Sequence, residues 1–129
     1  SHRVIAVGDL GAIVRWVGLV AGEPLPLRRL VSADALLGEV IEYLKVRFEA
    51  DPATVAASLA EVQFAVHEWY PTWPVAGHLA ELVMTTGIDL DATLLTPVVL
   101  AAETGLPLAT TSEEIAELAR PHVPAVMLV

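Results

Sequence analysis

The chain of 129 residues contains no cysteine and a single lysine, Lys45. Without cysteine there can be no disulfide, thiolate metal site or cysteine nucleophile. Seven basic residues stand against sixteen acidic ones, for a formal net charge of −9. This balance weighs against an extended nucleic-acid surface, because neutralisation of phosphates supplies most non-specific affinity. A nucleic-acid substrate would need a local basic patch, for which Arg15, Arg28 and Arg29 are the candidates, and a basic partner protein is the competing explanation for the acidity.

Long apolar runs are also missing, since charged residues interrupt the N-terminal third of the chain. No run reaches the roughly 18 to 20 residues that a membrane-spanning helix needs. The basic start, apolar core and cleavage pattern of a signal peptide are not found either. We therefore expect a cytoplasmic protein without a membrane segment.

Several catalytic motifs are lacking as well. The glycines do not follow the spacing of dinucleotide-binding or Walker loops, and there is no Gly-x-Ser-x-Gly elbow of a serine hydrolase. No expected helix carries a basic face for DNA recognition. These exclusions leave chemistry based on carboxylates, or no chemistry.

What the chain has in abundance is apolar material, with 55% hydrophobic residues and a mean hydropathy of +0.62. Its length is that of one ordinary domain, and we expect residues 1–129 to form a single one. Apolar runs of strand length alternate with segments of helical periodicity. This alternation predicts an α/β domain of three layers, with a central parallel sheet flanked by helices.

The expected strands are 3–7, 106–110 and 123–128, and the aromatic segment 69–74 is expected to be a loop. The expected helices are 11–21, 33–48, 52–66, 75–86, 98–104 and 113–120. Their predicted N-caps are Ser32, Asp51, Thr96 and Ser112. Gly87 and Gly105 are expected at the ends of two helices.

Acidic residues follow two of the expected strands. Asp9 comes just after the first strand, and Glu113 follows Ser112 after the strand 106–110. In a parallel sheet such strand ends share one edge, so the two can be brought together. Mg²⁺ prefers hard oxygen ligands of this kind, and it can activate a water for attack on a phosphate.

The segment Val7-Gly8-Asp9-Leu10-Gly11 contains the end of the first expected strand and an acid directly after it. This segment is similar to the strand and Asp-Thr-Ser-like sequence with which PIN-domain nucleases begin, and nearly the whole chain resembles that family. Ser32, followed by Glu39, is similar to their serine and helical glutamate. The stretch 100–112, Leu-Ala-Ala-Glu-Thr-Gly-Leu-Pro-Leu-Ala-Thr-Thr-Ser, is similar to their helix, turn, apolar strand and Thr-x-Asp end.

The sequence departs from the family pattern at three places. Leu10 and Gly11 replace the threonine or serine that follows the first acid. Leu94 stands where the third acid belongs, although a three-residue shift brings Asp91-Ala92 there. Ser112 occupies the position of the fourth acid, and Glu113 follows it.

The resemblance implies an endoribonuclease related to the VapC-type toxins, using Mg²⁺ or Mn²⁺. It implies Asp9, Glu39 and Asp91 as catalytic residues, and these three with Glu113 as metal ligands. Implied partners are RNA, an antitoxin protein and a second copy of the chain in a homodimer. Because two of the four family acids are displaced or lost, the alternative is a catalytically inactive PIN-like module that works through protein contacts.

Each of these acids also has an ordinary structural interpretation. Asp9 can N-cap the next helix, and Glu39 can be a solvated or salt-bridged helix residue. Asp89 and Asp91 fit a loop, and Glu113 suits a helix N-terminus electrostatically. The aromatics of 69–74, with His67 and His78 on either side, can stack bases, but they also suit a core or a dimer interface. His78 and Glu81 are spaced for one helix face, a weak metal signal.

Overall fold

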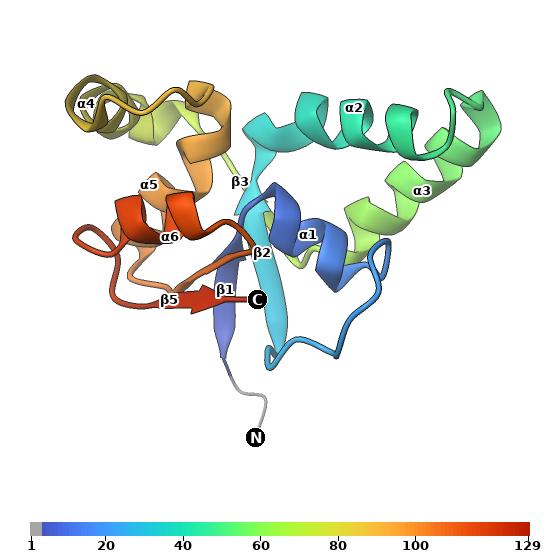
Figure 1. Cartoon of the computed structure of the whole chain (residues 1–129), viewed down its shortest axis with the longest axis horizontal. Helices are drawn as coiled ribbons and strands as arrows, with labels where there is room; N and C mark the ends of the chain where they lie inside the picture. Colours follow the sequence, from blue (N-terminus) through green and yellow to red (C-terminus); the bar gives the residue numbers. More distant parts are fainter. Residues whose placement is uncertain (1–3) are drawn as a thin grey trace.

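A single parallel sheet forms the centre of the molecule, in a computed structural model that describes residues 4–129. Its strand order is β3-β2-β1-β4-β5 (Figure 1). The strands are β1 (Ile5–Gly8), β2 (Arg29–Ala33), β3 (Glu68–Tyr70), β4 (Leu108–Thr110) and β5 (Val126–Leu128). The three-layer α/β class with a central parallel sheet is therefore confirmed.

Helices cover the sheet and connect its strands. The α-helices are α1 (Leu10–Trp16), α2 (Leu37–Arg47), α3 (Pro52–Ala65), α4 (Ala76–Thr86), α5 (Thr96–Thr104) and α6 (Glu113–Ala119). Three short 3-10 helices complete the set: η1 (Asp34–Leu36), η2 (Trp73–Val75) and η3 (Ala92–Leu95). No helix within the described range 4–129 is long and apolar enough to cross a membrane.

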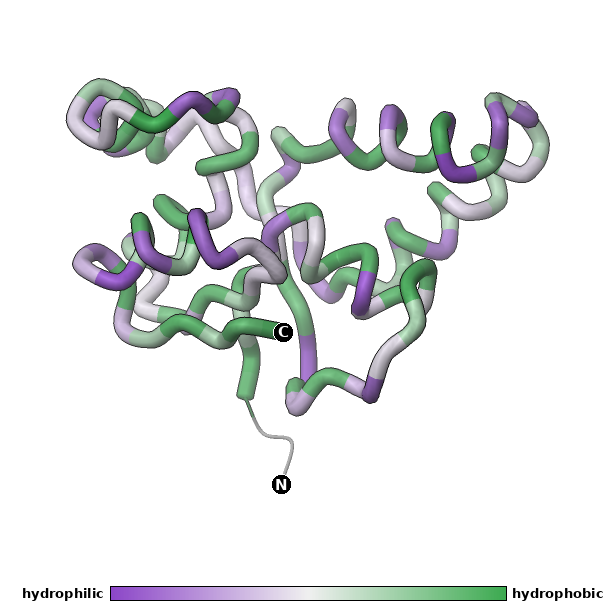
Figure 2. Tube along the Cα trace, in the orientation of Figure 1, coloured by the Kyte–Doolittle hydropathy of each residue, from purple (hydrophilic) through white to green (hydrophobic). Residues whose placement is uncertain are grey.

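The core lies where the central strands meet α5. All residues from Thr96 to Ala101 are buried, and this helix contacts β1, β2 and β4. Figure 2 shows the hydrophobic colouring of the central strands and the mixed colouring of α2, whose turns alternate between polar and apolar residues. A strand buried on both faces reads as a continuous apolar run, as β1 does.

Helix ends that depend on local chemistry follow the sequence prediction. The Asp51 carboxylate accepts a hydrogen bond from the Thr54 N–H at 3.1 Å, and Ser112 caps α6 in the same way. Gly87 and Gly105 end α4 and α5 with φ of 62° and 72°, a left-handed conformation that glycine adopts without strain. The prediction that Thr96 is an N-cap was wrong. Thr96 is the first residue of α5, and its hydroxyl donates to the Thr93 carbonyl at 2.7 Å.

The prediction that Ser32 caps a helix from residue 33 was wrong. Ser32 is fully buried inside β2, and its hydroxyl donates to the Gly8 carbonyl at 2.6 Å. The strand pairs with β1 in the register Ile5↔Arg29 and Val7↔Val31. Pairing with β1 stabilises the extended conformation of Ser32. The helical periodicity of the residues that follow had favoured a helix here.

Other boundaries also differ from the sequence prediction, and β4 and β5 each begin later than the expected strands 106–110 and 123–128. The first strand is Ile5–Gly8, and Arg3, its predicted start, lies outside the described residues. Helix α1 ends at Trp16 rather than at residue 21, since Gly18 has φ +79°. The aromatic segment is not only a loop, because Glu68–Tyr70 forms the edge strand β3 beside β2.

Candidate functional site

β1 and β4 are neighbours in the sheet, and the connections that follow them run to opposite sides. From β1 the chain continues to β2 on one side, whereas from β4 it continues to β5 on the other. In open α/β sheets, ligands bind at such a topological switch point. Asp9 follows β1 and Thr110 ends β4, and the pairing Gly8↔Ala109 brings their two segments together.

Asp9 is 4% exposed and bonded on both carboxylate oxygens. Oδ1 accepts from the Ala12 N–H at 2.9 Å, so Asp9 is the N-cap of α1. Oδ2 accepts from the hydroxyl of Thr110, which lies 101 residues further along the chain. The expectation that Asp9 caps the next helix is therefore confirmed.

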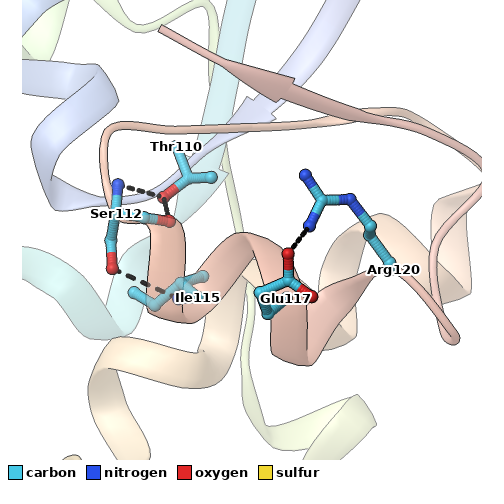
Figure 3. A network of polar contacts seen from close by, with 5 residues as sticks. All are labelled: Thr110, Ser112, Ile115, Glu117 and Arg120. Atoms are coloured by element: carbon cyan, nitrogen blue, oxygen red, sulfur yellow. Dashed lines mark hydrogen bonds and ion pairs between the residues drawn. The ribbon is translucent and has the colours of Figure 1, made fainter.

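The Thr110 hydroxyl continues this network into the next helix. It accepts from the Ser112 N–H at 3.0 Å. The Ser112 hydroxyl in turn accepts from the Ile115 N–H at 3.2 Å, which caps α6 (Figure 3). Ser112, at the fourth acid position of the family, is thus the N-cap of α6.

Burial sets the electrostatics of this site. Removal of Asp9 from water raises its pKa above the ordinary value of 3.8, and the hydrogen bonds from Thr110 and Ala12 oppose that rise. Desolvation disfavours the charged form of a carboxylate, whereas donors stabilise it. The net direction is upward, so the protein favours protonated Asp9 more than water does.

Close packing of α1 against the β4–α6 turn leaves little room beside Asp9. A Cβ placed on Gly11 would lie 1.9 Å from Thr111 Oγ1 and 3.0 Å from Thr111 Cβ. Real Cβ atoms do not approach other atoms so closely. A serine or threonine, which the family has after its first acid, would therefore require Thr111 to move if placed at Gly11.

The other predicted site residues occupy separate elements. Glu39 is half-buried in the first turn of α2. Asp91 is exposed and precedes η3 without a side-chain capping bond, in the loop that also contains Asp89. Glu113 is exposed in the first turn of α6, as its interpretation as a helix N-terminal residue expects.

These acids do not converge as a metal centre would require. Within residues 4–129, no three histidine, aspartate or glutamate side chains lie close enough together to hold a metal ion. Asp9 is bonded to two internal donors, and Ser112 stands in place of a carboxylate. This donor set does not fit the magnesium centre that the resemblance implies. The catalytic and metal roles of Asp9, Glu39, Asp91 and Glu113 stay predictions.

Two of the three arginines suggested for a basic patch have internal partners. Arg15 donates to the carbonyls of Val129 and Glu23, each at 2.7 Å. Arg29 contacts Nε2 of His67 at 2.9 Å, and Arg28 is exposed. The guanidinium of Arg15 therefore links segments of the fold by hydrogen bonds to backbone carbonyls.

The histidines and aromatics near 69–74 also have defined places. Nδ1 of His78 on α4 lies 2.8 Å from Glu103 on α5, which links these helices. Trp69 and Tyr70 are half-buried against the core, as one of the two interpretations of this segment expects, whereas Trp73 is 89% exposed.

Thr110 is the site residue that sequence reasoning missed as a functional partner. Thr110 ends an expected strand, and the ends of parallel strands share one edge of the sheet. This rule could have placed Thr110 near Asp9. The resemblance drew attention to the acid positions, whereas the polar group opposite Asp9 is a hydroxyl.

Comparison of the chain with protein-family models and with curated proteins gave no match. The fold carries the likeness instead. A five-stranded parallel sheet of order 3-2-1-4-5, packed by helices, is the arrangement of PIN domains.

Proposed function

We propose that this protein is a PIN-like domain that does not cleave RNA and acts through contacts with other proteins. The observation that carries the proposal is the state of Asp9. This carboxylate is buried, caps α1 and bonds to Thr110, while Ser112 caps α6 where the family has an acid. Side chains at two of the family's acid positions therefore stabilise helix ends, which supports a module without nuclease activity.

The competing function is Mg²⁺- or Mn²⁺-dependent cleavage of RNA, in the manner of VapC-type toxins. Its support is the position of Asp9 at the switch point between β1 and β4. In that case Asp9, Glu39 and Asp91 would hold the metal, and a basic antitoxin would regulate the site. A metal would have to replace the donors that Asp9 now has, and metals favour the ionised carboxylate that burial disfavours.

The test is a calorimetric titration of Mn²⁺ together with incubation with a mixed-sequence oligoribonucleotide. The variants are the double substitution Asp9→Asn with Glu39→Gln and, as a matched control, Asp89→Asn in the exposed loop. We expect no saturable Mn²⁺ heat, and RNA turnover by the native chain no faster than by the double variant. Saturable binding and cleavage that survive in Asp89→Asn but vanish in the double variant would establish the nuclease instead.

A gain-of-site variant sharpens this test. Ser112→Asp keeps a side chain that caps helices well and restores an acid beside Thr110. If the loss of this acid helped to disable the centre, the variant should bind Mn²⁺ more tightly than the native chain does. Equal binding would show that the missing carboxylate is not what limits metal affinity.

A further inference from the structure

A hollow of about 270 Å³ lies where α2 and α3 meet the edge of the sheet. The two helices diverge from their connecting turn toward the sheet, and the hollow lies at the open end of this V (Figure 1). Leu37 and Val40 line it from α2, and Leu59 and Val62 line it from α3. Trp69 on β3 adds an aromatic side chain to the wall. The hollow is therefore mostly apolar and is shared by three elements of the fold.

The volume of the hollow sets the size of its occupant. An apolar cavity of roughly 150 Å³ holds benzene, and pockets for drug-sized molecules begin at about 300 Å³. With about 270 Å³, the hollow fits a molecule of one or two rings. Water gains little there, because aliphatic side chains offer it no hydrogen bonds.

Two polar groups in the wall have unused hydrogen-bonding capacity. Oδ1 of Asp34 accepts from the Thr72 hydroxyl at 3.0 Å, whereas no hydrogen bond within residues 4–129 uses Oδ2. The indole N–H of Trp69 has no partner in that range either. The only fully buried side-chain N or O atom without a partner there is Thr86 Oγ1. The half-buried Trp69 thus keeps its N–H in contact with space that water can enter.

The charges around the hollow favour an uncharged occupant. Asp34 is the one charged side chain in its wall among the described residues, and the chain as a whole carries −9, so an anion is repelled. A cation gains little, because Asp34 is exposed and solvent screens an ion pair there. A neutral hydroxyl suits both free groups, since it can donate to a carboxylate and accept from an indole N–H.

We propose that this hollow binds an uncharged aromatic molecule of one or two rings that carries a phenolic hydroxyl. The rings lie among the apolar side chains, the hydroxyl donates to Oδ2 of Asp34, and its oxygen is available to the Trp69 N–H. The bound molecule contacts α2, α3 and β3 together, so it stabilises the folded chain by mass action. This site goes beyond the proposed function, which neither requires nor excludes a small ligand.

Naphthol is the probe, because it is uncharged at pH 7 and combines two rings with one hydroxyl. The matching methoxynaphthalene keeps the rings but cannot donate a hydrogen bond, and the matching naphthoate carries a negative charge. We expect naphthol to bind the native chain at least fivefold more tightly than methoxynaphthalene in a calorimetric titration, because the ether leaves Oδ2 of Asp34 without a donor. Naphthoate should show no saturable binding.

An isosteric variant tests the role of the carboxylate. Asp34→Asn keeps an oxygen for the Thr72 hydroxyl and places N–H donors where Oδ2 was. The preference for naphthol over methoxynaphthalene should disappear in this variant, while the affinity for methoxynaphthalene should not fall. Asp89→Asn, the same change in the exposed α4–η3 loop, should leave both affinities as in the native chain.

A second pair of variants locates the rings. Leu37→Ala removes an apolar group that lines the hollow and is already 56% exposed, so the chain should still fold. It should weaken the binding of naphthol and methoxynaphthalene alike, by at least threefold. Met84→Ala makes a similar change at an 83% exposed position on α4 and should leave both affinities unchanged.

Three results would each overturn the proposal: no saturable binding of naphthol, equal affinity of the native chain for naphthol and methoxynaphthalene, or native affinities in Leu37→Ala. A preference for naphthol that persists in Asp34→Asn would reject the carboxylate as its acceptor. The proposed function fails on separate readouts, because Mn²⁺ and RNA take no part in these titrations.

Discussion

Asp9 joins parts of the chain that lie far apart. One oxygen accepts from the first turn of α1 and the other accepts from the end of β4, so a single carboxylate links the helix to a strand on the other side of β1. A buried carboxylate is favourable only when donors satisfy it. Here both donors are internal, which explains why the group is retained without any need for a ligand.

Asp9→Asn should leave the protein at least as stable as the native chain at pH 7. Asparagine caps helices as well as aspartate does, and it has no charge to desolvate. The folded pKa of Asp9 lies above the ordinary 3.8. The stability it contributes is therefore fully present below pH 3.8 and is lost as pH rises through the folded pKa.

Urea unfolding of both proteins across this pH range measures the effect. The free energy of unfolding of the native chain, minus that of Asp9→Asn, should be greater in acid than at pH 7. A difference that grows with rising pH would mean that the folded protein favours the ionised form, as a working metal ligand would.

At the scale of single residues, the sequence predicts hydrogen bonds between residues that are close together in the chain. The caps at Asp9, Asp51 and Ser112 each involve a backbone N–H three residues ahead, and all three could be anticipated. The bond from Thr110 to Asp9 could not, because it depends on how β1 and β4 pair.

Among the elements, the strands β2 and β3 were the hardest to predict. β2 and β3 have only five and three residues, and each is extended because a neighbouring strand supplies its hydrogen bonds. Local patterns instead favoured an early helix start at Ser32 and a loop at the aromatics. The helices α3, α4 and α6 could be placed because their end signals and apolar spacing lie within their own sequence.

The contact between α1 and the β4–α6 turn gives a test of element packing. Gly11→Ala should destabilise the protein by about 1 to 3 kcal/mol, in the range of overpacked sites, because its Cβ would meet Thr111 at 1.9 Å. Thr111→Gly removes that obstacle, so the double variant should recover much of the loss. Chemical denaturation of the four proteins in a double-mutant cycle measures the coupling, and additive effects would contradict this packing.

The alternation of strands and helices was enough to predict the α/β class of the whole molecule, although the prediction contained only three of the five strands in the described part of the chain. Parallel pairing and helices on the sheet follow from that order through general rules of connection. The acidic site could not be predicted in the same way. Glu39, Asp91 and Glu113 lie in three separate elements, and sequence alone does not fix the distances between them.

Self-association is a property of the whole molecule and stays a prediction. We expect a homodimer of about twice 13.7 kDa by light scattering at micromolar concentration. The measurement needs about 0.15 M salt, because a net charge of −9 on each chain opposes association and salt screens that repulsion. A mass near 14 kDa for the native chain would refute the dimer.

The shortness of the two outer strands has a consequence for solubility. β3 and β5 each have three residues and form the edges of the sheet. An edge of this length offers few free backbone groups to a strand from another molecule, and natural proteins use short edge strands to avoid fibrous aggregation. The sheet is thus poorly suited to growth by strand addition, and the chain can expose apolar helix faces without also offering a template for amyloid-like assembly.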